Sequence, residues 1–464
     1  MKITRIVIPN FQQFREFDLS LTDPTTGEPL DRVCFIGRNG TGKTTLLRLV
    51  FDLLGGVVNR PSQFLRERGL RGDLGVSGLV SEESGARPGD HQVLVALKVL
   101  TNFRPFWVCS TRRGEIVLCG ESIEGDDWNR VEVFRHRISG LEEKGLTEQL
   151  SWTATGGALF MIAPPDGTTL ITQGKALPDT NLNNALRLFK EFPVFHEVSV
   201  EHIAPFWNVL IYHLKKREED WQTFLQQREN RQKSVQEAEE EFARNHPEIL
   251  VELAELWNTI LAAAGLEFDY ESAKKPVQLS ENLEAFVRVA SSGQPINYNA
   301  LSTGIRNFIF RIGHIYSLYF GRQIKRGVLL LDEPENSLYP DFLYDLMSVY
   351  WRIICNTQFF TATHSPIIAA QFRPEERVIL DFDDAAYVVP HRGVTPIGDD
   401  PNDMLNKDFE VRSLYGKEGI ENWERFLQLR REIPAVTDPQ QKQHLIQEYM
   451  RIGNAYNFAP DAIS

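Results

Sequence analysis

The chain has 464 residues, of which 42% are hydrophobic and 11% aromatic. This length allows two or three domains of about 100–200 residues, and the apolar content suffices for a buried core, which excludes an intrinsically disordered chain. Against 50 Lys and Arg stand 63 Asp and Glu, a net charge of −13. That balance argues against a protein whose whole surface coats DNA, so any contact with nucleic acid is expected to be regional.

The sequence shows no clear pattern for a membrane span, a signal peptide or a cysteine-based metal site. The strongest apolar run, Gly327–Leu331, is ended at once by Asp332 and is far shorter than the ~18–20 residues that cross a bilayer. The start, Met1–Arg5, has no signal-peptide pattern. Four scattered cysteines favour neither a disulfide framework nor a zinc knuckle. We therefore expect a cytoplasmic protein without a membrane segment.

The N-terminal part predicts two strands followed by a helix. Ile3–Ile8 and Arg32–Ile36 are apolar runs on either side of the turn-like Asp23–Gly27. Thr44–Leu54 is apolar nearly all round, so this helix should lie buried against a sheet. The pair Gly55-Gly56 is expected to end it.

The middle of the chain changes character twice. A stretch rich in Gly, Ser and Arg, residues 60–90, precedes short strand-like runs that predict a small antiparallel β lobe; these are His91–Leu100, Pro105–Ser110, Glu115–Gly120 and Leu159–Ala163. Between Ile203 and Gly265 the period becomes helical and charge is dense, which predicts a solvated helical pair. Apolar positions there hold no sustained heptad, so a long coiled coil is disfavoured.

A second α/β half follows, and the chain ends in polar helices. The predicted strands are Val328–Leu331, Gln358–Thr361 and Arg377–Leu380, and the predicted tail helices are Glu421–Arg431 and Gln440–Tyr449. The expected fold is α/β, with an antiparallel β lobe, a short helical insertion and a helical C-terminal tail. The expected domains are residues 1–200, 201–290, 291–400 and 401–464.

Gly37–Thr44 fits the P-loop pattern G-x-x-x-x-G-K-[ST] in full, between an apolar strand and an apolar helix. Glycines let backbone N–H groups turn toward phosphates, and the helix presents its positive end to them. Lys43 is expected to bridge the β and γ oxygens of ATP, and the Thr44 hydroxyl to ligate Mg²⁺. The predicted nucleotide-binding residues here are Gly37, Asn39, Gly40, Gly42, Lys43, Thr44 and Thr45.

Two acids end the apolar strand at Val328–Leu331. A phosphate hydrolase places one carboxylate near Mg²⁺ and another where it can polarise water. Asp332 is therefore expected to hold the metal and Glu333 to act as the base. A strand that ends in Asp-Glu is often an ordinary strand end, but its position after a P-loop favours the functional interpretation.

Further motifs follow in a fixed order. Ser302, in Leu-Ser-Thr-Gly, is a natural N-cap for an apolar helix. After it come Leu-Asp-Glu-Pro-Glu-Asn-Ser-Leu-Tyr-Pro and Thr-His-Ser-Pro. With the P-loop, this series resembles the ATP-binding-cassette (ABC) ATPases, in the soluble branch that includes SMC-type, RecF-like and overcoming-lysogenization-defect (OLD) proteins. The resemblance covers residues 1–60 and 295–385 and says little about residues 61–290.

The resemblance implies a composite site between two copies arranged head to tail. Ser302 and Gly304 of one copy would reach the γ-phosphate held by the other, since a capped helix N-terminus is a ready anion site. His364 resembles a switch histidine that contacts the γ-phosphate. Ile305 stands where many relatives carry Glu or Gln, a departure from the pattern. Gln173 is a candidate for the family's glutamine loop by order alone.

Several functions compete for such an ATPase. In the resemblance, Leu301–Gly304 is the signature segment. The interval between the P-loop and this segment is too long for a transporter domain, and the insertion is too short for the arms of SMC-type proteins. The acidic run Asp381–Asp384 superficially suggests an OLD-type nuclease, but no later strand with paired acids follows, so it is interpreted as a solvated strand end. Any cleavage of nucleic acid would then be done by a partner.

The overall layout resembles ATPase subunits of bacterial anti-phage systems of the Septu, PARIS or retron-associated type. The leading hypothesis is an ATP-hydrolysing sensor or scaffold that forms a homo-oligomer and controls a separate effector, such as a nuclease. Alternatives are a RecF-like repair ATPase that clamps DNA and a stand-alone switch. Lys215–Trp257 and Glu421–Tyr449 are candidate docking surfaces, because both have amphipathic helical patterns.

Overall fold

The structure is a computed structural model, and its chain divides into two compact units, Met1–Gly398 and Asp399–Ser464. It describes residues 2–59, 93–100, 105–111, 116–119, 157–162, 195–198, 217, 219–245, 249–268, 287–296, 300–322, 326–353, 356–411, 413 and 415–458. The Gly-, Ser- and Arg-rich stretch and Gln173 lie outside these residues. No described helix has both the length and the hydropathy to span a bilayer.

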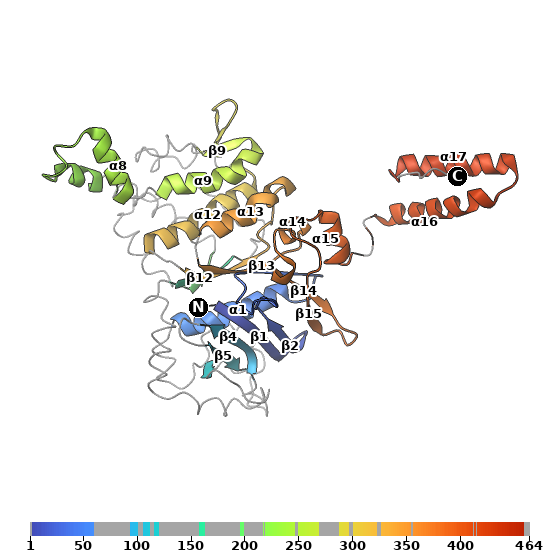
Figure 1. Cartoon of the computed structure of the whole chain (residues 1–464), viewed down its shortest axis with the longest axis horizontal. Coiled ribbons are helices and arrows are strands. Elements are labelled where there is room, and N and C mark those ends of the chain that lie inside the picture. Colours follow the sequence, from blue (N-terminus) through green and yellow to red (C-terminus); the bar gives the residue numbers. More distant parts are fainter. Residues whose placement is uncertain are drawn as a thin grey trace. The chain divides into compact units, whose positions relative to one another are not determined.

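The first sheet of the larger unit is antiparallel. Within the described residues it has five strands in the order β2-β1-β4-β5-β6 (Figure 1). The strands are β1 (Lys2–Phe11), β2 (Phe14–Ser20), β4 (Val93–Leu100), β5 (Pro105–Thr111) and β6 (Ile116–Cys119). β2 is an addition to the expected strands. Phe14, Phe17 and Leu19 are its buried residues, and a positive φ of 50° at Glu16 interrupts the alternation that sequence patterns rely on.

The second sheet is mostly parallel and has seven described strands in the order β15-β14-β3-β13-β12-β7-β8. They are β3 (Arg32–Gly37), β7 (Gly157–Ile162), β8 (Phe195–Glu197), β12 (Arg326–Asp332), β13 (Thr357–Ala362), β14 (Arg377–Phe382) and β15 (Val388–Arg392). Only β15 runs antiparallel to its described neighbour. Val328 to Leu331 are fully buried, as expected of a central parallel strand covered on both faces.

One expected strand belongs to a different sheet. β7 was assigned by sequence to the antiparallel lobe, but it pairs in parallel with β12. Its sequence, Gly-Ala-Leu-Phe-Met-Ile, is a continuous apolar run, a pattern typical of parallel strands buried on both faces. The antiparallel assignment was therefore wrong.

Helix α1 (Lys43–Asn59) lies between the two sheets and contacts strands of both (Figure 1). Its leucines from Leu46 to Leu54 are buried, in agreement with their all-round apolar pattern. The expected end at Gly55-Gly56 is wrong, because the helix continues through both glycines. Two glycines cost only about 1 kcal/mol each in a helix, which packing can override.

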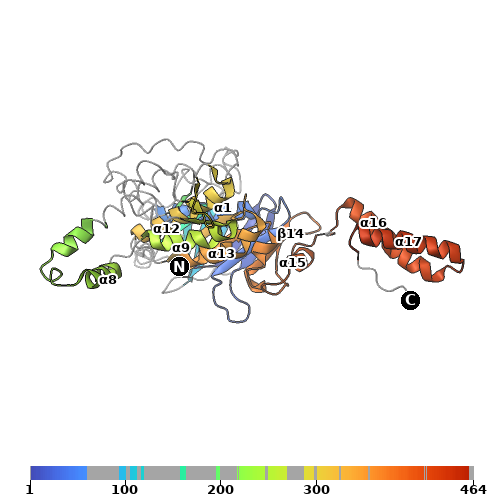
Figure 2. The same cartoon turned by 90° about the horizontal axis from the view of Figure 1, so that it is seen from above.

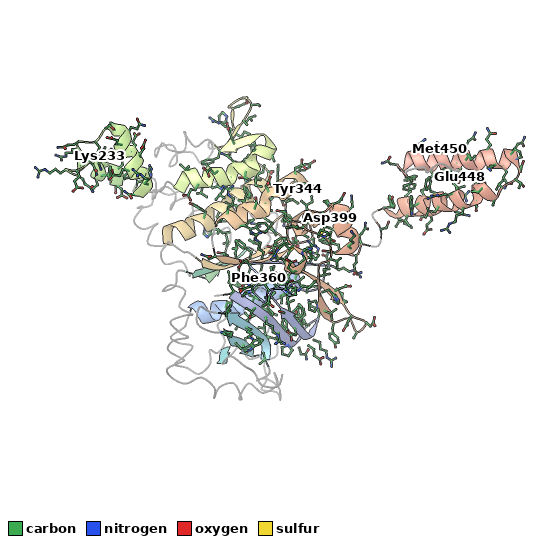
Figure 3. All side chains as sticks on the ribbon, viewed as in Figure 1. Lys233, Tyr344, Phe360, Asp399, Glu448 and Met450 are labelled. Atoms are coloured by element: carbon green, nitrogen blue, oxygen red, sulfur yellow. The ribbon has the colours of Figure 1, made fainter. Side chains whose placement is uncertain are left out.

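Buried hydrogen bonds also join the two sheets directly. Gln358 of β13 accepts the N–H of Ile3 at 2.7 Å and donates to the carbonyls of Ile3 and Leu30, both at 2.8 Å. Phe360, labelled in Figure 3, is fully buried and its ring stacks with that of Phe35 at 6.3 Å. The two sheets and α1 therefore share one core.

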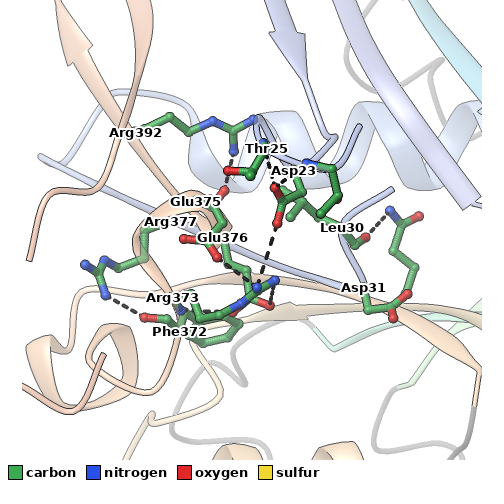
Figure 4. A network of polar contacts seen from close by, with 12 residues as sticks. Asp23, Thr25, Leu30, Asp31, Phe372, Arg373, Glu375, Glu376, Arg377 and Arg392 are labelled. Atoms are coloured by element: carbon green, nitrogen blue, oxygen red, sulfur yellow. Dashed lines mark hydrogen bonds and ion pairs between the residues drawn. The ribbon is translucent and has the colours of Figure 1, made fainter. Parts of the chain in front are cut away.

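A polar network fixes β14 to the N-terminal region (Figure 4). Arg373 pairs with Glu375 at 2.8 Å and with Asp23 at 3.8 Å, and its N–H donates to Glu376 at 2.9 Å. Arg392 donates to the Glu375 carbonyl at 2.7 Å. These contacts anchor the start of β14, which is the strand beside β3.

Helices α9 (Ile249–Leu261), α12 (Thr303–Arg322) and α13 (Pro340–Ile353) pack together in Figures 1 and 2, on the side of the parallel sheet away from α1. Trp257 of α9 is fully buried and donates to the Ile309 carbonyl at 3.0 Å. The expectation of a solvated helical pair is therefore wrong for α9. A small sheet of β9 (Leu266–Phe268), β10 (Val287–Val289) and β11 (Pro295–Ile296) follows α9.

The charged part of the insertion forms a local hairpin. The helical residues 219–226 turn at 227–233 into α8 (Val235–Asn245). Phe224 and Phe242 form its small core with Trp221, and Lys233 (Figure 3) pairs with Glu241 at 2.6 Å.

The smaller unit contains α15 (Pro401–Lys407), α16 (Lys417–Glu432) and α17 (Pro439–Ala455). Phe426 of α16 stacks on Tyr449 of α17 with ring centroids 4.2 Å apart, in an aromatic and aliphatic core. Arg425 forms a two-pronged pair with Glu448 at 3.0 and 2.9 Å (Figure 3). The expected helical C-terminal region is present.

Candidate functional site

The site lies where three adjacent parallel strands end. β3 leads into the P-loop, β13 into Thr363 and His364, and β12 into Asp332 and Glu333. Because β13 pairs with both β3 and β12, the histidine lies between the P-loop and the two acids. The carboxyl edge of a parallel sheet is the usual ligand-binding edge.

The P-loop glycines have conformations that other residues resist. Gly37 and Gly42 have φ of 146° and 83°. A Cβ on Gly37 would lie 2.2 Å from the Leu380 carbonyl oxygen, and one on Gly42 would lie 2.2 Å from Gln13 Nε2 and 2.7 Å from Phe14 Cζ. The loop is thus held against β14 on one side and the β1–β2 turn on the other.

Lys43 lies inside this loop and is only 7% exposed. Its Nζ donates to the carbonyls of Gly37 at 2.8 Å and Arg38 at 3.2 Å. Burial lowers its pKa to about 8, against the attraction of nearby carboxylates, of which Glu333 is the strongest. The ammonium group is therefore poorly solvated and placed to take an anionic partner.

Asp332 and Thr44, the two predicted metal ligands, lie together. The Asp332 carboxylate is 1% exposed and accepts a hydrogen bond from the Thr44 side chain. Burial raises the pKa of Asp332 to about 6, and the bond from Thr44 opposes that shift. Its Oδ2 has no hydrogen-bond partner among the described residues. A buried carboxylate and a hydroxyl are hard oxygen donors, which fits Mg²⁺ held by few protein ligands plus phosphate oxygens.

Glu333 and His364 face each other at the open side of the site. His364 Nε2 lies 4.0 Å from Glu333 Oε1, and 38% and 39% of the two side chains are exposed. Burial, and then repulsion from Lys43, lower the pKa of His364, while Glu333 raises it. Glu333 has a left-handed φ of 45°, and its N–H donates to the Ala362 carbonyl at 2.9 Å. This left-handed residue directly follows Asp332, the last residue of β12.

The signature segment begins α12 as expected. Ser302 is exposed, and its hydroxyl accepts the N–H of Ile305 at 3.4 Å. Ile305 is 7% exposed, so the residue that departs from the family pattern packs in the interior. Gly304 is also buried, against the backbone of Ser337.

The remaining predicted residues occupy less constrained positions. Asn39 and Gly40 are exposed in the P-loop, and Thr45 is half-buried in the first turn of α1. Asp383 caps the β14–β15 turn by accepting the N–H groups of Ala385 and Tyr387 at 2.9 and 2.8 Å. In that acidic run, Asp383 therefore stabilises the turn, and Asp381, in β14, lies 4.0 Å from Arg38 Nε.

Two residues at the site had no assigned role in the sequence. Gln13 Nε2 donates to the Gly40 carbonyl at 3.3 Å. Glu335 accepts hydrogen bonds from Thr363 and from the His364 N–H. Glu335 is the third acid of Asp-Glu-Pro-Glu, a signal that the sequence offered, but Gln13 lies in a turn with no motif around it.

Comparison with known proteins gives one family. The model described as "AAA ATPase domain" matches residues 1–55 and 172–369, more than half of the chain. No curated protein matches the sequence.

Solved structures of SMC heads align over most of the chain at low similarity. The Smc head bound to the C-winged helix domain of ScpA aligns with a TM-score of 0.42 at 12% identity, covering 84% of this chain and 98% of that one. A Smc head with an extended coiled coil, bound to the C-terminal domain of ScpA from Pyrococcus furiosus, gives 0.42 at 16%, covering 84% and 96%. The SMC head domain from Thermotoga maritima gives 0.38 at 12%, covering 85% and 100%.

The family match includes the P-loop, Asp332, Glu333 and His364, which the fold brings to one edge of the parallel sheet. The chain therefore belongs to the AAA ATPase domain family and is an ATPase.

Proposed function

We propose that two copies of this chain hydrolyse ATP in composite sites and so control a separate effector in an anti-phage system. In each site, Lys43 and the P-loop hold the phosphates, and Thr44 and Asp332 hold Mg²⁺, which neutralises phosphate charge when bound. Glu333 orients the attacking water, and His364 contacts the γ-phosphate. Ser302 and Gly304 of the second copy complete the site.

The exposed side of the P-loop site is the main support for the association of two copies. More than a third of the side chains of Glu333 and His364 is exposed, whereas Lys43 and Asp332 behind them are almost fully buried. Hydrolysis gains from excluding water around the reacting groups. A second copy bringing the exposed Ser302 and the N-terminus of α12 would cover this face and add an anion-binding group.

The proposed reaction uses Lys43 to bind phosphate and Glu333 to accept a proton. On nucleotide binding, Lys43 Nζ would exchange its bonds to the Gly37 and Arg38 carbonyls for bonds to phosphate oxygens, which compensate its charge better. The Glu333 carboxylate would accept a proton from water that attacks the γ-phosphorus, and the bond from that phosphorus to the bridging oxygen of ADP would break.

The smaller unit, Asp399–Ser464, supports the scaffold role. Its helices have their own aromatic core, built on Phe426 and Tyr449, and it contributes no predicted phosphate-binding residue. Such an element can bind an effector while the larger unit binds ATP. The stretch Lys215–Trp257 cannot serve as a docking surface along its full length, because Trp257 is buried against α12.

Co-purification tests the defence role directly. The Glu333→Gln chain should co-purify with the products of neighbouring genes, including a nuclease, and deletion of residues 421–464 should abolish this. ATP-dependent dimerisation without any protein partner, but with tight binding of duplex DNA, would favour the RecF-like alternative instead.

A further inference from the structure

Glu335 holds the loop that presents His364. Its Oε1 accepts the Thr363 hydroxyl at 2.5 Å and the His364 N–H at 3.0 Å. The Thr363 hydroxyl in turn accepts the Ser365 N–H at 2.9 Å. One carboxylate oxygen therefore binds the His364 N–H directly and the Ser365 N–H through the Thr363 hydroxyl.

Thr363 makes this clamp rigid. It is fully buried, and its N–H donates to the Phe35 carbonyl at 3.1 Å, so it continues the pairing of β13 with β3. β3 leads directly into the P-loop. Two contacts therefore hold the backbone at His364 in place relative to the P-loop: the pairing of Thr363 with β3 and the hydrogen bonds to the Glu335 side chain.

A carboxylate suits this place better than an amide. Charge-assisted hydrogen bonds are about twice as strong as neutral ones, and two donors converge here on one oxygen. The second oxygen, Oε2, is buried with no hydrogen-bond partner among the described residues. A glutamine would place its NH₂ group either at this position, without an acceptor, or at the position of Oε1, where it would face the donors of Thr363 and His364.

The same carboxylate is coupled to the signature helix. Arg311 of α12 is 5% exposed, bonds the Tyr350 hydroxyl of α13, and is attracted electrostatically by Glu335. Ser302 caps the first turn of α12. Burial raises the pKa of Glu335, and the bonds from Thr363 and the His364 N–H oppose that shift. The carboxyl group therefore contacts the histidine loop directly and interacts at a distance with Arg311 of the helix that begins at the signature.

We infer that Glu335 is a positioning residue, which acts on hydrolysis by holding His364 in register with the γ-phosphate. The inference rests on the proposed role of His364 and adds to it a residue that touches no substrate. A positioning role requires that loss of Glu335 matter only while His364 is present.

The test measures kcat and KM for ATP in Glu335→Gln, Glu335→Leu, His364→Ala and the double variant Glu335→Gln with His364→Ala. Glu335→Gln should lower kcat about tenfold with little change in KM, the size expected when charge-assisted bonds are replaced by neutral ones. Glu335→Leu should lower it further. The double variant should be no slower than His364→Ala.

Glu376→Gln is the matched control. Glu376 is also buried and also accepts a neighbouring N–H, that of Arg373 at 2.9 Å, but it lies away from the site in the cap before β14. It should lose thermal stability at unchanged kcat. Thr363→Ser, which keeps the hydroxyl, should retain more kcat than Thr363→Val.

The outcomes distinguish the role of Glu335 from that of His364. Independent, multiplicative losses from Glu335→Gln and His364→Ala would overturn the positioning role while leaving that of His364 intact. Full activity in His364→Ala would overturn both. A loss in Glu335→Gln matched by Glu376→Gln would show a merely structural effect and would also overturn the inference.

Discussion

Gly304 of the signature segment is in direct contact with the backbone of Ser337, in the turn that follows β12. A Cβ at Gly304 would lie 2.0 Å from the Ser337 carbonyl oxygen and 2.6 Å from its carbon. Ser337 itself has a left-handed φ of 66°. The start of α12 and the turn after Glu333 are therefore packed against each other so tightly that only glycine fits between them.

Gly304→Ala should displace this turn and slow hydrolysis. Overpacking of this kind costs about 1–3 kcal/mol of stability, and misplacing Glu333 should lower kcat by at least about tenfold. Nucleotide affinity should change little, because the P-loop is not in the contact. Gly416→Ala, where a Cβ meets nothing within 4 Å, is the control. Unaltered kcat in Gly304→Ala would show that the contact does not place Glu333.

Glu333→Gln should separate binding from turnover. The amide keeps the shape of the side chain but cannot accept the proton of the attacking water, so kcat should fall by about 100-fold or more. Asp332 and Thr44 are untouched, so affinity for a fluorescent ATP analogue with Mg²⁺ should persist. Phosphate release at the wild-type rate would remove Glu333 from the mechanism.

Stability of the nucleotide-free chain should rise with pH through the titration of Lys43. Its pKa is about 8 in the folded chain and 10.5 in the reference state, so between these values the unfolded chain binds more protons and the free energy of unfolding increases with pH. Lys43→Met lacks this contribution. The melting temperature of the wild type, relative to that of Lys43→Met, should therefore climb from about pH 8 to pH 10; a constant difference would argue against a buried, poorly solvated Lys43.

Phe426→Ala should unfold the smaller unit selectively. Removing this buried ring from its stack on Tyr449 should cost about 3–5 kcal/mol, which a two-helix core has little capacity to absorb. ATP turnover should stay within about twofold, while co-purification with an effector should be lost. A parallel loss of turnover would mean that the smaller unit is needed for catalysis.

The sequence predicted the strands and the helix around the P-loop and the strand before Asp332 because their signals are local. A P-loop needs its glycines at fixed spacing, and buried strands such as Val328–Leu331 are readable as apolar runs. Which strands pair is set by contacts distant in sequence, so β7 was placed in the wrong sheet. Glu16, with its positive φ, hid β2 by breaking the alternation.

Other features depended on tertiary packing. The apolar residues of α9, among them Leu253 and Trp257, were a local sign of burial, but the partner that covers them, α12, is set by contacts distant in sequence. Glu335 has a role only because β12 and β13 are neighbours, which brings Thr363 to its carboxylate. Such roles come from topology, which motif spacing does not encode.

The composite site is tested most directly by mixing two inactive variants. Lys43→Ala and Ser302→Arg should each abolish turnover alone. In an equal mixture, half of the dimers would pair an intact P-loop with an intact signature in one of their two sites, so about a quarter of wild-type activity should return. No recovery, with mixed dimers shown to form, would contradict the head-to-tail arrangement.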